Sequence, residues 1–543
     1  MSQTKHLPFT RADEARYVIP MKFWNRAFHP TRRPLLAAGA LVLAACAQMA
    51  PPGDAEYSNR YSSEMFGTGY SFISDRYIET VSLRKLSLAG LSGLRQIDSN
   101  IDIRSVNNAI EVQYQDRTVG QVRSPRSDDP EAWSEATVSA IAMARNASPV
   151  LADARAETVF KAVFDGVVQP LDKFSRYDDA ETASEKRAYR DGFGGIGVTI
   201  RMEQDDAHIL DVNERGPAAK AGVKPEDRIT HVEGKAIAGW TQRQLVDHLR
   251  GPVNTTAAFT LRRPGGTNPI SVQVTRRHVV PETVKIRREQ NIAIIRLTGF
   301  NVESAKQLER LVRREMRSPA GPPSGFVLDV RSNPGGRLDV SIDIADIFLD
   351  SGNIIVTRGR HPGSRQAFEA SAGDVTGQRP IVVLINGGSA SASEIVAAAL
   401  QDHGRAVVIG TNSFGKGTVQ SVLRLPNNGE ITLTWSRFLA PSGYQLHDLG
   451  VLPTICTHGG GDTQSADALV PAVRGGANTL AGQLGTWRAT RNRDAAERAG
   501  LRQICPSDGG TPDVDIAVAR EIISNTGLYA SLLRQADTAV ARR

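Results

Sequence analysis

A run of small and hydroxyl-bearing residues follows a strongly apolar stretch in the second half of the 543-residue chain. The run, residues 386–394, reads Asn-Gly-Gly-Ser-Ala-Ser-Ala-Ser-Glu and separates a buried-strand pattern over 380–385 from a helical pattern over 393–402. A serine at such a corner lies at a helix N-terminus, where free backbone N–H groups favour developing negative charge. The run alone predicts either a serine nucleophile or a helix cap in which Ser389 or Ser393 binds backbone donors.

A lysine between two glycines follows one helix and one strand later, where residues 413–420 read Ser-Phe-Gly-Lys-Gly-Thr-Val-Gln. A lysine amine can act as a general base only when burial or a nearby positive charge lowers its pKa. The glycines on either side allow close packing around Lys416. If the segment is extended, the even offset puts Gln420 on the same face as Lys416, where it could orient the amine.

Together the two segments resemble the C-terminal processing peptidases, also called tail-specific proteases. That family has a small-residue serine turn, a helix ending in Gln-Asp, a strand and then Phe-Gly-Lys-Gly-Thr-Val-Gln, and residues 64–456 reproduce this order. The resemblance implies a serine endopeptidase with Ser391 as nucleophile and Lys416 as general base. Family members are described with either the glutamine or the aspartate as third member. We expect Gln420 to orient the amine and Asp402 to support it.

A glycine turn follows another predicted strand, where residues 329–336 read Asp-Val-Arg-Ser-Asn-Pro-Gly-Gly. In the family this turn faces the nucleophile. The resemblance therefore implies that the N–H groups of Gly335, Gly336 and Ala392 form the oxyanion hole, which stabilises the tetrahedral intermediate. A plain strand-to-helix turn is the alternative interpretation.

Other chemistries fit the residues less well. Residues 410–417 nearly match a P-loop, but Gly417 stands where a Ser or Thr hydroxyl would bind Mg²⁺. A triad built on His403 or His447 would require a Gly-x-Ser-x-Gly elbow, which the serine turn does not have. The sequence contains no His-Glu-x-x-His and no Cys/His cluster with metal-ligand spacing. We expect no metal, no nucleotide and no other cofactor.

Short β-like runs around two short helices occupy residues 192–277 and resemble a PDZ domain. The resemblance depends on Phe-Gly-Gly-Ile-Gly-Val at 193–198 and Gly-Pro-Ala-Ala-Lys-Ala-Gly at 216–222. In PDZ domains a glycine loop binds a terminal carboxylate through backbone N–H groups, and the peptide adds as a strand beside the next edge. This implies protein or peptide substrates with free apolar C-termini. The implied peptide-binding residues are Gly194, Gly195, Ile196, Gly197, Leu245 and Leu249, of which the two leucines could instead be ordinary core residues.

The rest of the chain supplies the elements that must hold these residues. Residues 64–185 read as a mainly helical N-terminal domain with a short β portion near 110–122. From residue 290 onward strand and helix patterns alternate, which is typical of an α/β sheet with helical cover. We predict an α/β protein: a mixed-sheet serine protease core at 281–456 with the PDZ domain inserted before it, and a helical tail at 457–543 without chemical signal.

The N-terminus has the features of a bacterial lipoprotein leader. Residues 34–45 are apolar, follow several arginines and are too few to span a bilayer, which predicts a signal peptide over 1–45, with Met21 as an alternative start. The sequence Leu-Ala-Ala-Cys ending at Cys46 resembles the lipobox, which implies that Cys46 is acylated and anchors the chain to a membrane. Residues 46–63 would form a tether to the lipid.

We expect the protein to face the periplasm, at the outer rather than the inner membrane, because the residue after Cys46 is not the aspartate that retains many lipoproteins at the inner membrane. An adaptor lipoprotein is a further partner that the sequence neither indicates nor excludes. Without Cys46 the chain keeps Cys456 and Cys505, which are either a disulfide or two free thiols. The net charge of +7 is modest and its arginines are scattered, so we expect no nucleic-acid partner.

The predicted function is endoproteolysis of envelope proteins. The PDZ domain would recognise their C-terminal tails, and Ser391 and Lys416 would cleave through an acyl-enzyme. A non-catalytic PDZ scaffold that binds protein C-termini is the alternative from another class of protein.

Overall fold

The computed structural model describes residues 58–541, except for 372, 458–464, 478, 490–494 and 508–511. The signal peptide, Cys46 and most of the tether, for which the sequence makes predictions, lie outside these residues. Of the helices within the described part, none is both long enough and apolar enough to cross a membrane.

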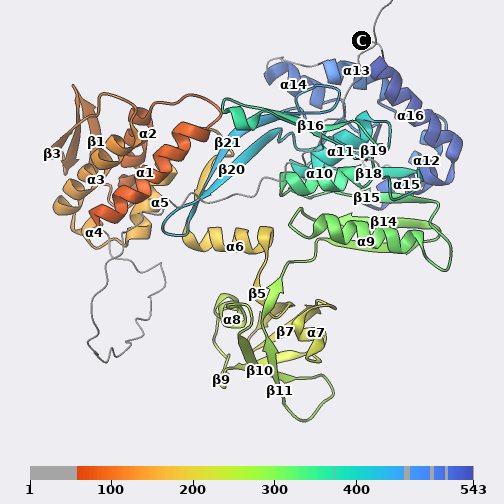
Figure 1. The fold of residues 1–543 in the computed structure, drawn as a ribbon, viewed down its shortest axis with the longest axis horizontal. Coiled ribbons are helices and arrows are strands. Elements are labelled where there is room, and N and C mark those ends of the chain that lie inside the picture. Colours follow the sequence, from red (N-terminus) through yellow and green to blue (C-terminus); the bar gives the residue numbers. More distant parts are fainter. Residues whose placement is uncertain are drawn as a thin grey trace, which may run out of the picture. The chain divides into compact units, whose positions relative to one another are not determined.

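The N-terminal domain is mainly helical, as the sequence predicts, and carries a small antiparallel sheet (Figure 1). Aromatic residues fill its core, including Phe66, Trp133 and Phe164. The longest helix after the sheet begins at Pro130, where the Asp129 carboxylate accepts the Ala132 N–H and caps the first turn. The elements are α1 Asn59–Arg76, α2 Leu83–Ser92, η2 Gly93–Gln96, β1 Ile101–Val106, β2 Ala109–Tyr114, β3 Arg117–Arg123, α3 Pro130–Ala147, α4 Pro149–Ala152 and α5 Ala156–Val168.

The segment expected to be a PDZ domain follows β4 Arg176–Asp178 and α6 Ala180–Asp191. Its main sheet has the order β11-β10-β8-β7-β6, with β9 beside β8, and β5 pairs separately with β12. A capping box of Thr241 and Gln244 starts α8. The elements are β5 Phe193–Gly195, β6 Val198–Glu203, β7 Asp206–Val212, α7 Pro217–Lys220, β8 Arg228–Val232, β9 Lys235–Ala236, α8 Gln242–Leu249, β10 Thr256–Arg262, β11 Ile270–Thr275 and β12 Arg277–Val279.

The catalytic core is built on a six-stranded mixed sheet of order β13-β14-β15-β18-β19-β22. The β13–β14 pair is antiparallel and the other neighbours are parallel. Helices α9, α10 and α11 pack on one face, where they meet alternate strand residues such as Val383. The elements are β13 Val284–Glu289, β14 Ile292–Leu297, α9 Ser304–Met316, β15 Gly325–Asp329, α10 Leu338–Asp346, β18 Ile381–Ile385, α11 Ala392–Asp402, β19 Val407–Gly410 and β22 Ile455–Cys456.

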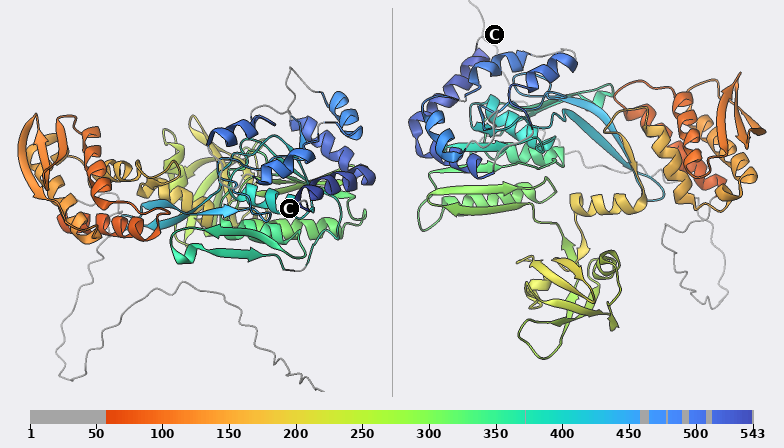
Figure 2. Two further views of the ribbon diagram at one scale, coloured as in Figure 1. Left: turned by 90° about the horizontal axis from the view of Figure 1, so that it is seen from above. Right: turned by 180° about the vertical axis from the view of Figure 1, so that it is seen from behind.

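The C-terminal helices α12, α15 and α16 cover the other face of this sheet, whereas α13 packs in the core on the first face (Figures 1 and 2). Val382 and Leu384, which alternate with Val383, pack there against Val518 and Ile522. The segment after Cys456, which carries no chemical signal in the sequence, therefore completes the fold. Its elements are α12 Ala466–Arg474, α13 Ala481–Ala489, α14 Ala495–Arg502, α15 Pro512–Ser524 and α16 Thr526–Ala541.

A second sheet, of order β17-β16-β21-β20, adds a long hairpin to the core (Figure 1). Strand β4 also pairs with β21, and Leu425 and Ile431 of the hairpin belong to the core of the N-terminal domain. The hairpin thus contacts two parts of the protein. Its sheet consists of β16 Asn353–Arg358, β17 Gln366–Glu369, β20 Thr418–Arg424 and β21 Glu430–Leu439, with the short η3 Pro362–Ser364 before β17.

Candidate active site

The serine turn connects the buried strand β18 to helix α11. Ser389 and Ser393 are fully buried, and their hydroxyls donate to the carbonyl oxygens of Val330 and Asn333 at 2.8 and 2.9 Å. Ser391 is partly exposed and has a φ of +57°, a backbone conformation that L residues rarely adopt. Ser389 and Ser393 hold the turn but do not cap α11, whose N-cap residue is Ser391. The role of Ser391 as nucleophile stays a prediction.

The lysine loop, residues 411–417, connects β19 to β20 and carries Lys416 partly buried. Burial lowers the pKa of the Lys416 amine, and the positive charge of Arg176 lowers it further, whereas Glu394 and Asp172 raise it. The Nζ atom lies 5.2 Å from the centroid of the Phe174 ring. The direction of the pKa shift is the one that a lysine general base requires.

A buried glutamate joins the serine turn to the lysine loop. The Glu394 carboxylate accepts the N–H groups of Ser391 at 2.7 Å and of Lys416 at 2.9 Å on the same oxygen. Its other oxygen accepts the Gly415 N–H at 2.6 Å and the Ser413 hydroxyl. Because both N–H groups donate to one oxygen, the backbone nitrogens of Ser391 and Lys416 must lie close together.

Glu394 is the functional residue that sequence reasoning missed. Burial raises the pKa of its carboxyl, and the four hydrogen bonds that it accepts lower it. The spacing of three residues from Ser391 is that of a capping box, Ser-x-x-Glu, and this signal could have found it. The capping box does not reveal that the same carboxylate also holds a loop 21 residues further along the chain.

The glycine turn after β15 lies directly against the serine turn. A Cβ on Gly335 would stand 2.7 Å from the Ala390 oxygen and 3.0 Å from the Ser391 Cβ, so a side chain does not fit there. The Gly335 N–H donates to the Asn333 Oδ1 at 2.9 Å and is not free to bind an oxyanion, which corrects that part of the expectation. Among the described residues, the N–H groups of Gly336 and Ala392 have no hydrogen-bond acceptor.

The two candidates for a third member have other partners. The Gln420 amide donates to the Thr418 hydroxyl at 2.9 Å and to the Thr434 hydroxyl at 3.4 Å. Asp402, at the end of α11, forms a buried ion pair with Arg488 at 2.8 Å. Within the described part of the chain, Lys416 forms no hydrogen bond or ion pair with Gln420, Asp402 or Ser391. The structure thus brings the serine turn and the lysine loop together but leaves the choice of third member as a prediction.

The glycine loop of the PDZ-like segment has a fixed backbone. Gly194 and Gly195 belong to β5, which pairs with β12, and Gly197 has a φ of +78°. The carbonyl oxygens of Ile196 and Gly197 accept the N–H groups of Ala218 and Asn213. Their own N–H groups have no acceptor among the described residues, as a site for a carboxylate requires. The predicted contacts Leu245 and Leu249 lie buried in the core of this domain.

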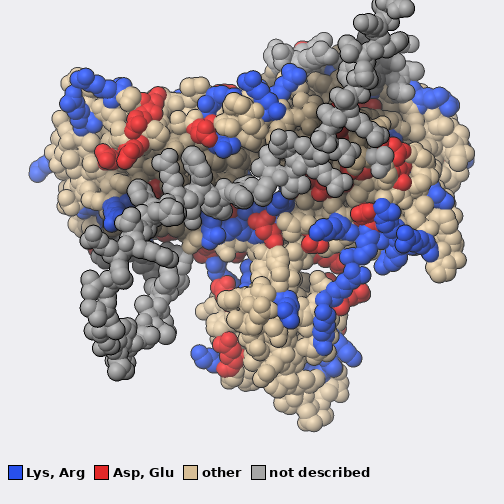
Figure 3. Space-filling model, in the orientation of Figure 1, with Lys and Arg blue, Asp and Glu red and all other residues tan. Residues whose placement is uncertain are grey.

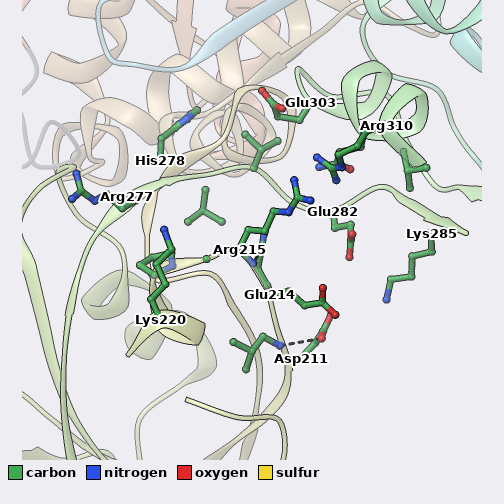
Figure 4. Close-up of a pocket in the computed structure, with 18 of the residues that line it drawn as sticks. Asp211, Glu214, Arg215, Lys220, Arg277, His278, Glu282, Lys285, Glu303 and Arg310 are labelled. Atoms are coloured by element: carbon green, nitrogen blue, oxygen red, sulfur yellow. Dashed lines mark hydrogen bonds between the residues drawn. The ribbon is translucent and has the colours of Figure 1, made fainter. Parts of the chain in front are cut away.

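A separate, positively charged cleft of about 1170 Å³ opens between residues 211–221, residues 273–286 and helix α9 (Figure 4). It includes Arg215, Arg277 and Arg310 but no residue of the serine turn or lysine loop. Lys and Arg side chains also gather over α9 on the surface (Figure 3). Among the described residues, no group of His, Cys, Asp and Glu is placed to hold a metal ion.

Comparisons with known proteins identify both domains. Residues 291–457 match the model of peptidase family S41, and residues 194–274 match the PDZ domain. The carboxy-terminal-processing protease of Bartonella bacilliformis is 41% identical over 301 residues, which cover 55% of this chain and 69% of that protein. The carboxy-terminal processing protease CtpA of Bacillus subtilis is 34% identical over 293 residues, 53% of this chain and 62% of that protein.

Among solved structures, the photosystem II D1 C-terminal processing protease is 26% identical, covers 62% of this chain and 88% of its own, and has a TM-score of 0.33. The matches to the peptidase and PDZ family models and to the Bartonella bacilliformis protein confirm the family that the serine turn and lysine loop indicate, and the PDZ domain. The chain belongs to the carboxy-terminal-processing proteases, which are serine peptidases of family S41.

Proposed function

We propose that the protein cleaves peptide bonds with Ser391 as nucleophile and Lys416 as general base. The observation that carries this proposal is the shared Glu394 oxygen, because it fixes the backbone of both residues next to each other in a buried setting. The lowered pKa of Lys416 supports the role of base.

The reaction follows from these positions. The Ser391 hydroxyl attacks the substrate carbonyl and gives its proton to the neutral Lys416 amine. The N–H groups of Gly336 and Ala392 donate to the oxyanion of the tetrahedral intermediate. Lys416 then protonates the leaving amine, which produces an acyl-enzyme. A water molecule gives a proton to Lys416 and attacks the ester. The tetrahedral intermediate then releases the carboxylic acid, and Lys416 returns the proton to the leaving Ser391 oxygen, which restores both residues.

Lys416 must approach Ser391 for this reaction, since its ammonium group now lies over Phe174. The Lys416 side chain has four rotatable bonds and is only partly buried, so a change of rotamer can move its amine toward Ser391. Gln420 and Asp402 remain the proposed alternatives for the third member. Gln420 is on the strand that begins two residues after Lys416, which favours it for orienting the amine.

A pair of substitutions tests the assignment. Ser391→Ala and Lys416→Met should each lower the cleavage rate of an unfolded protein with an apolar C-terminus by several orders of magnitude. Ser371→Ala and Lys85→Met, at exposed positions away from both turns, are the matched controls and should cleave like the wild type. A serine-directed irreversible probe should label the wild type and not Ser391→Ala. Cleavage that survives in both active-site variants would refute the assignment.

We also propose that the PDZ domain binds the free C-terminus of the substrate through the N–H groups of Ile196 and Gly197. The support is that both groups lack an acceptor in a loop whose carbonyl oxygens are fixed. A peptide that ends in a carboxylate should bind the full chain more tightly than the same peptide with a C-terminal amide. Equal dissociation constants for the two peptides, measured with Ser391→Ala, would contradict this role.

Finally, we propose that Cys46 is acylated and anchors the protein to the periplasmic face of the cell envelope, at the outer membrane. The support comes from the leader and the sequence Leu-Ala-Ala-Cys. Mass spectrometry of the mature N-terminal peptide should show a lipid on Cys46. An unmodified Cys46 at that terminus would refute the anchor, and fractionation of the membranes tests its location.

A further inference from the structure

The part of the chain beyond the peptidase-family match contacts all three turns of the active site. The match ends at residue 457, yet Arg502, Ser507 and Asp515 form hydrogen bonds, an ion pair or close contacts at the lysine loop, the serine turn and the glycine turn. A disulfide between Cys456 and Cys505 fixes this segment to the end of strand β22. These contacts involve buried or half-buried side chains rather than surface pairs.

The lysine loop packs on residues 446–450. A Cβ on Gly417 would stand 2.0 Å from the His447 nitrogen, so the two backbones are in direct contact. The Asp448 N–H donates to the Gly415 oxygen at 2.9 Å, immediately before Lys416. The position of Lys416 therefore depends on where residues 446–450 are held.

Arg502 of α14 holds these residues. Its Nη1 donates to the Leu449 oxygen at 2.7 Å, and its own carbonyl oxygen accepts the Asn412 side-chain amide at 2.8 Å. The same guanidinium nitrogen stands 3.3 Å from the position of a Cβ on Gly415. Arg502 thus connects the support at 446–450 with the start of the lysine loop, from both its side chain and its backbone.

The positive charge of Arg502 also favours the ionised form of Glu394. Burial lowers the pKa of its guanidinium, whereas the negative charge of Glu394 raises it. The guanidinium also approaches Gly415, whose N–H donates to the Glu394 carboxylate, so the two charged groups flank the same residue. A nearby cation favours the ionised form of Glu394, and only the carboxylate can accept all four hydrogen bonds that join the serine turn to the lysine loop.

The other turns have contacts of the same kind. The Ser507 oxygen would stand 2.6 Å from a Cβ on Gly387 in the serine turn, and it accepts the Thr411 hydroxyl at 3.3 Å. Asp515 of α15 pairs with Arg331 beside the glycine turn at 2.7 Å. We propose that Arg502, Ser507 and Asp515, beyond the peptidase-family match, support the turns that carry the reaction, and that Arg502 is a positioning residue that holds the Lys416 loop against the serine turn.

This inference rests on the proposed roles of Ser391 and Lys416, and the test separates the two. Arg502→Gln should lower kcat by about tenfold to a hundredfold, the size of effect that a small misplacement of a catalytic group produces, with KM changed less than about twofold. Arg502→Lys, which keeps a cationic donor toward Leu449, should recover part of kcat. Asn412→Ala, which removes the other end of the same connection, should also lower kcat selectively.

Arg474→Gln is the matched control. It removes an exposed arginine of α12, which lies before the residues in the proposal. Its ion pair with Glu521 joins α12 to α15 away from the turns, so kcat should stay at the wild-type value. Kinetics are compared per folded enzyme, with circular dichroism and the thermal midpoint of each variant. Wild-type kcat in folded Arg502→Gln and Asn412→Ala would overturn the inference. So would an equal loss in Arg474→Gln, or a rise in KM without loss of kcat. Wild-type activity that survives Ser391→Ala would instead overturn the proposed function.

Discussion

Replacing Glu394 by glutamine should separate the serine turn from the lysine loop with almost no change in side-chain size. One carboxylate oxygen accepts the N–H groups of Ser391 and Lys416. The other accepts the N–H group of Gly415 and the hydroxyl of Ser413. A glutamine has only one accepting oxygen, and its amide nitrogen is a donor. At least two buried donors would face another donor and lose their acceptor.

The cost follows from these lost acceptors. A buried donor without an acceptor costs about 1–3 kcal/mol, so Glu394→Gln should destabilise the protein by about 2–6 kcal/mol. The substitution also removes a negative charge that raises the pKa of Lys416. A general base is active when it is neutral, so the rate rises with pH through the pKa of Lys416, and the midpoint of that rise should move to lower pH in Glu394→Gln.

Urea unfolding and the pH dependence of kcat/KM measure the two effects. Glu309→Gln is the control, because Glu309 pairs with Arg313 on the exposed side of α9, and its loss should cost less than about 1 kcal/mol. If Glu394→Gln unfolds at the wild-type urea concentration and keeps the wild-type pH midpoint, Glu394 does not hold the two turns together and the reasoning from its four hydrogen bonds is wrong.

Three further predictions concern the surroundings of the site. Arg176→Gln removes a positive charge that lowers the pKa of Lys416, so the midpoint of the rise in kcat/KM should move to higher pH, opposite to Glu394→Gln; an unchanged midpoint in a pH titration would contradict this. Cys505→Ala opens a disulfide that closes 49 residues of chain and should lower the free energy of unfolding by about 4 kcal/mol, and the wild type under reducing conditions should show the same loss in urea unfolding. Gly335→Ala places a methyl group 2.7 Å from a backbone oxygen of the serine turn at a φ of +100°, so kcat should fall while peptide binding by the PDZ domain stays unchanged; full activity would show that the glycine turn can move away.

The sequence predicts those parts of the molecule in which local pattern and spacing are sufficient. The alternating strands and helices from residue 290 onward indicate the α/β core, and the glycines around Lys416 indicate a closely packed loop. Both are properties of short segments. The resemblance to a family adds the pairing of Ser391 with Lys416, which lie 25 residues apart and which periodicity alone could not connect.

The remaining features depend on contacts between distant segments. Glu394 reads as an ordinary residue of a helical first turn, and only the fold shows that it is fully buried between two turns. The Arg502 side chain contacts a residue 53 positions earlier in the chain, and its neighbours Leu501 and Gln503 form no recognisable motif with it. The Gly335 N–H is taken by Asn333 two residues before it, a local turn that a resemblance to a glycine motif does not reveal.

The β20–β21 hairpin gives the protein a mechanical connection between its N-terminal domain and its chemistry. One end of the hairpin begins two residues after Lys416, and the other end places Leu425 and Ile431 in the core of the N-terminal domain. Strand β20 pairs with β21 along its whole length, so we expect a rotation of the N-terminal domain to shift the backbone that follows Lys416. A partner that binds the N-terminal helices would thereby change the reactivity of the enzyme without contacting the substrate.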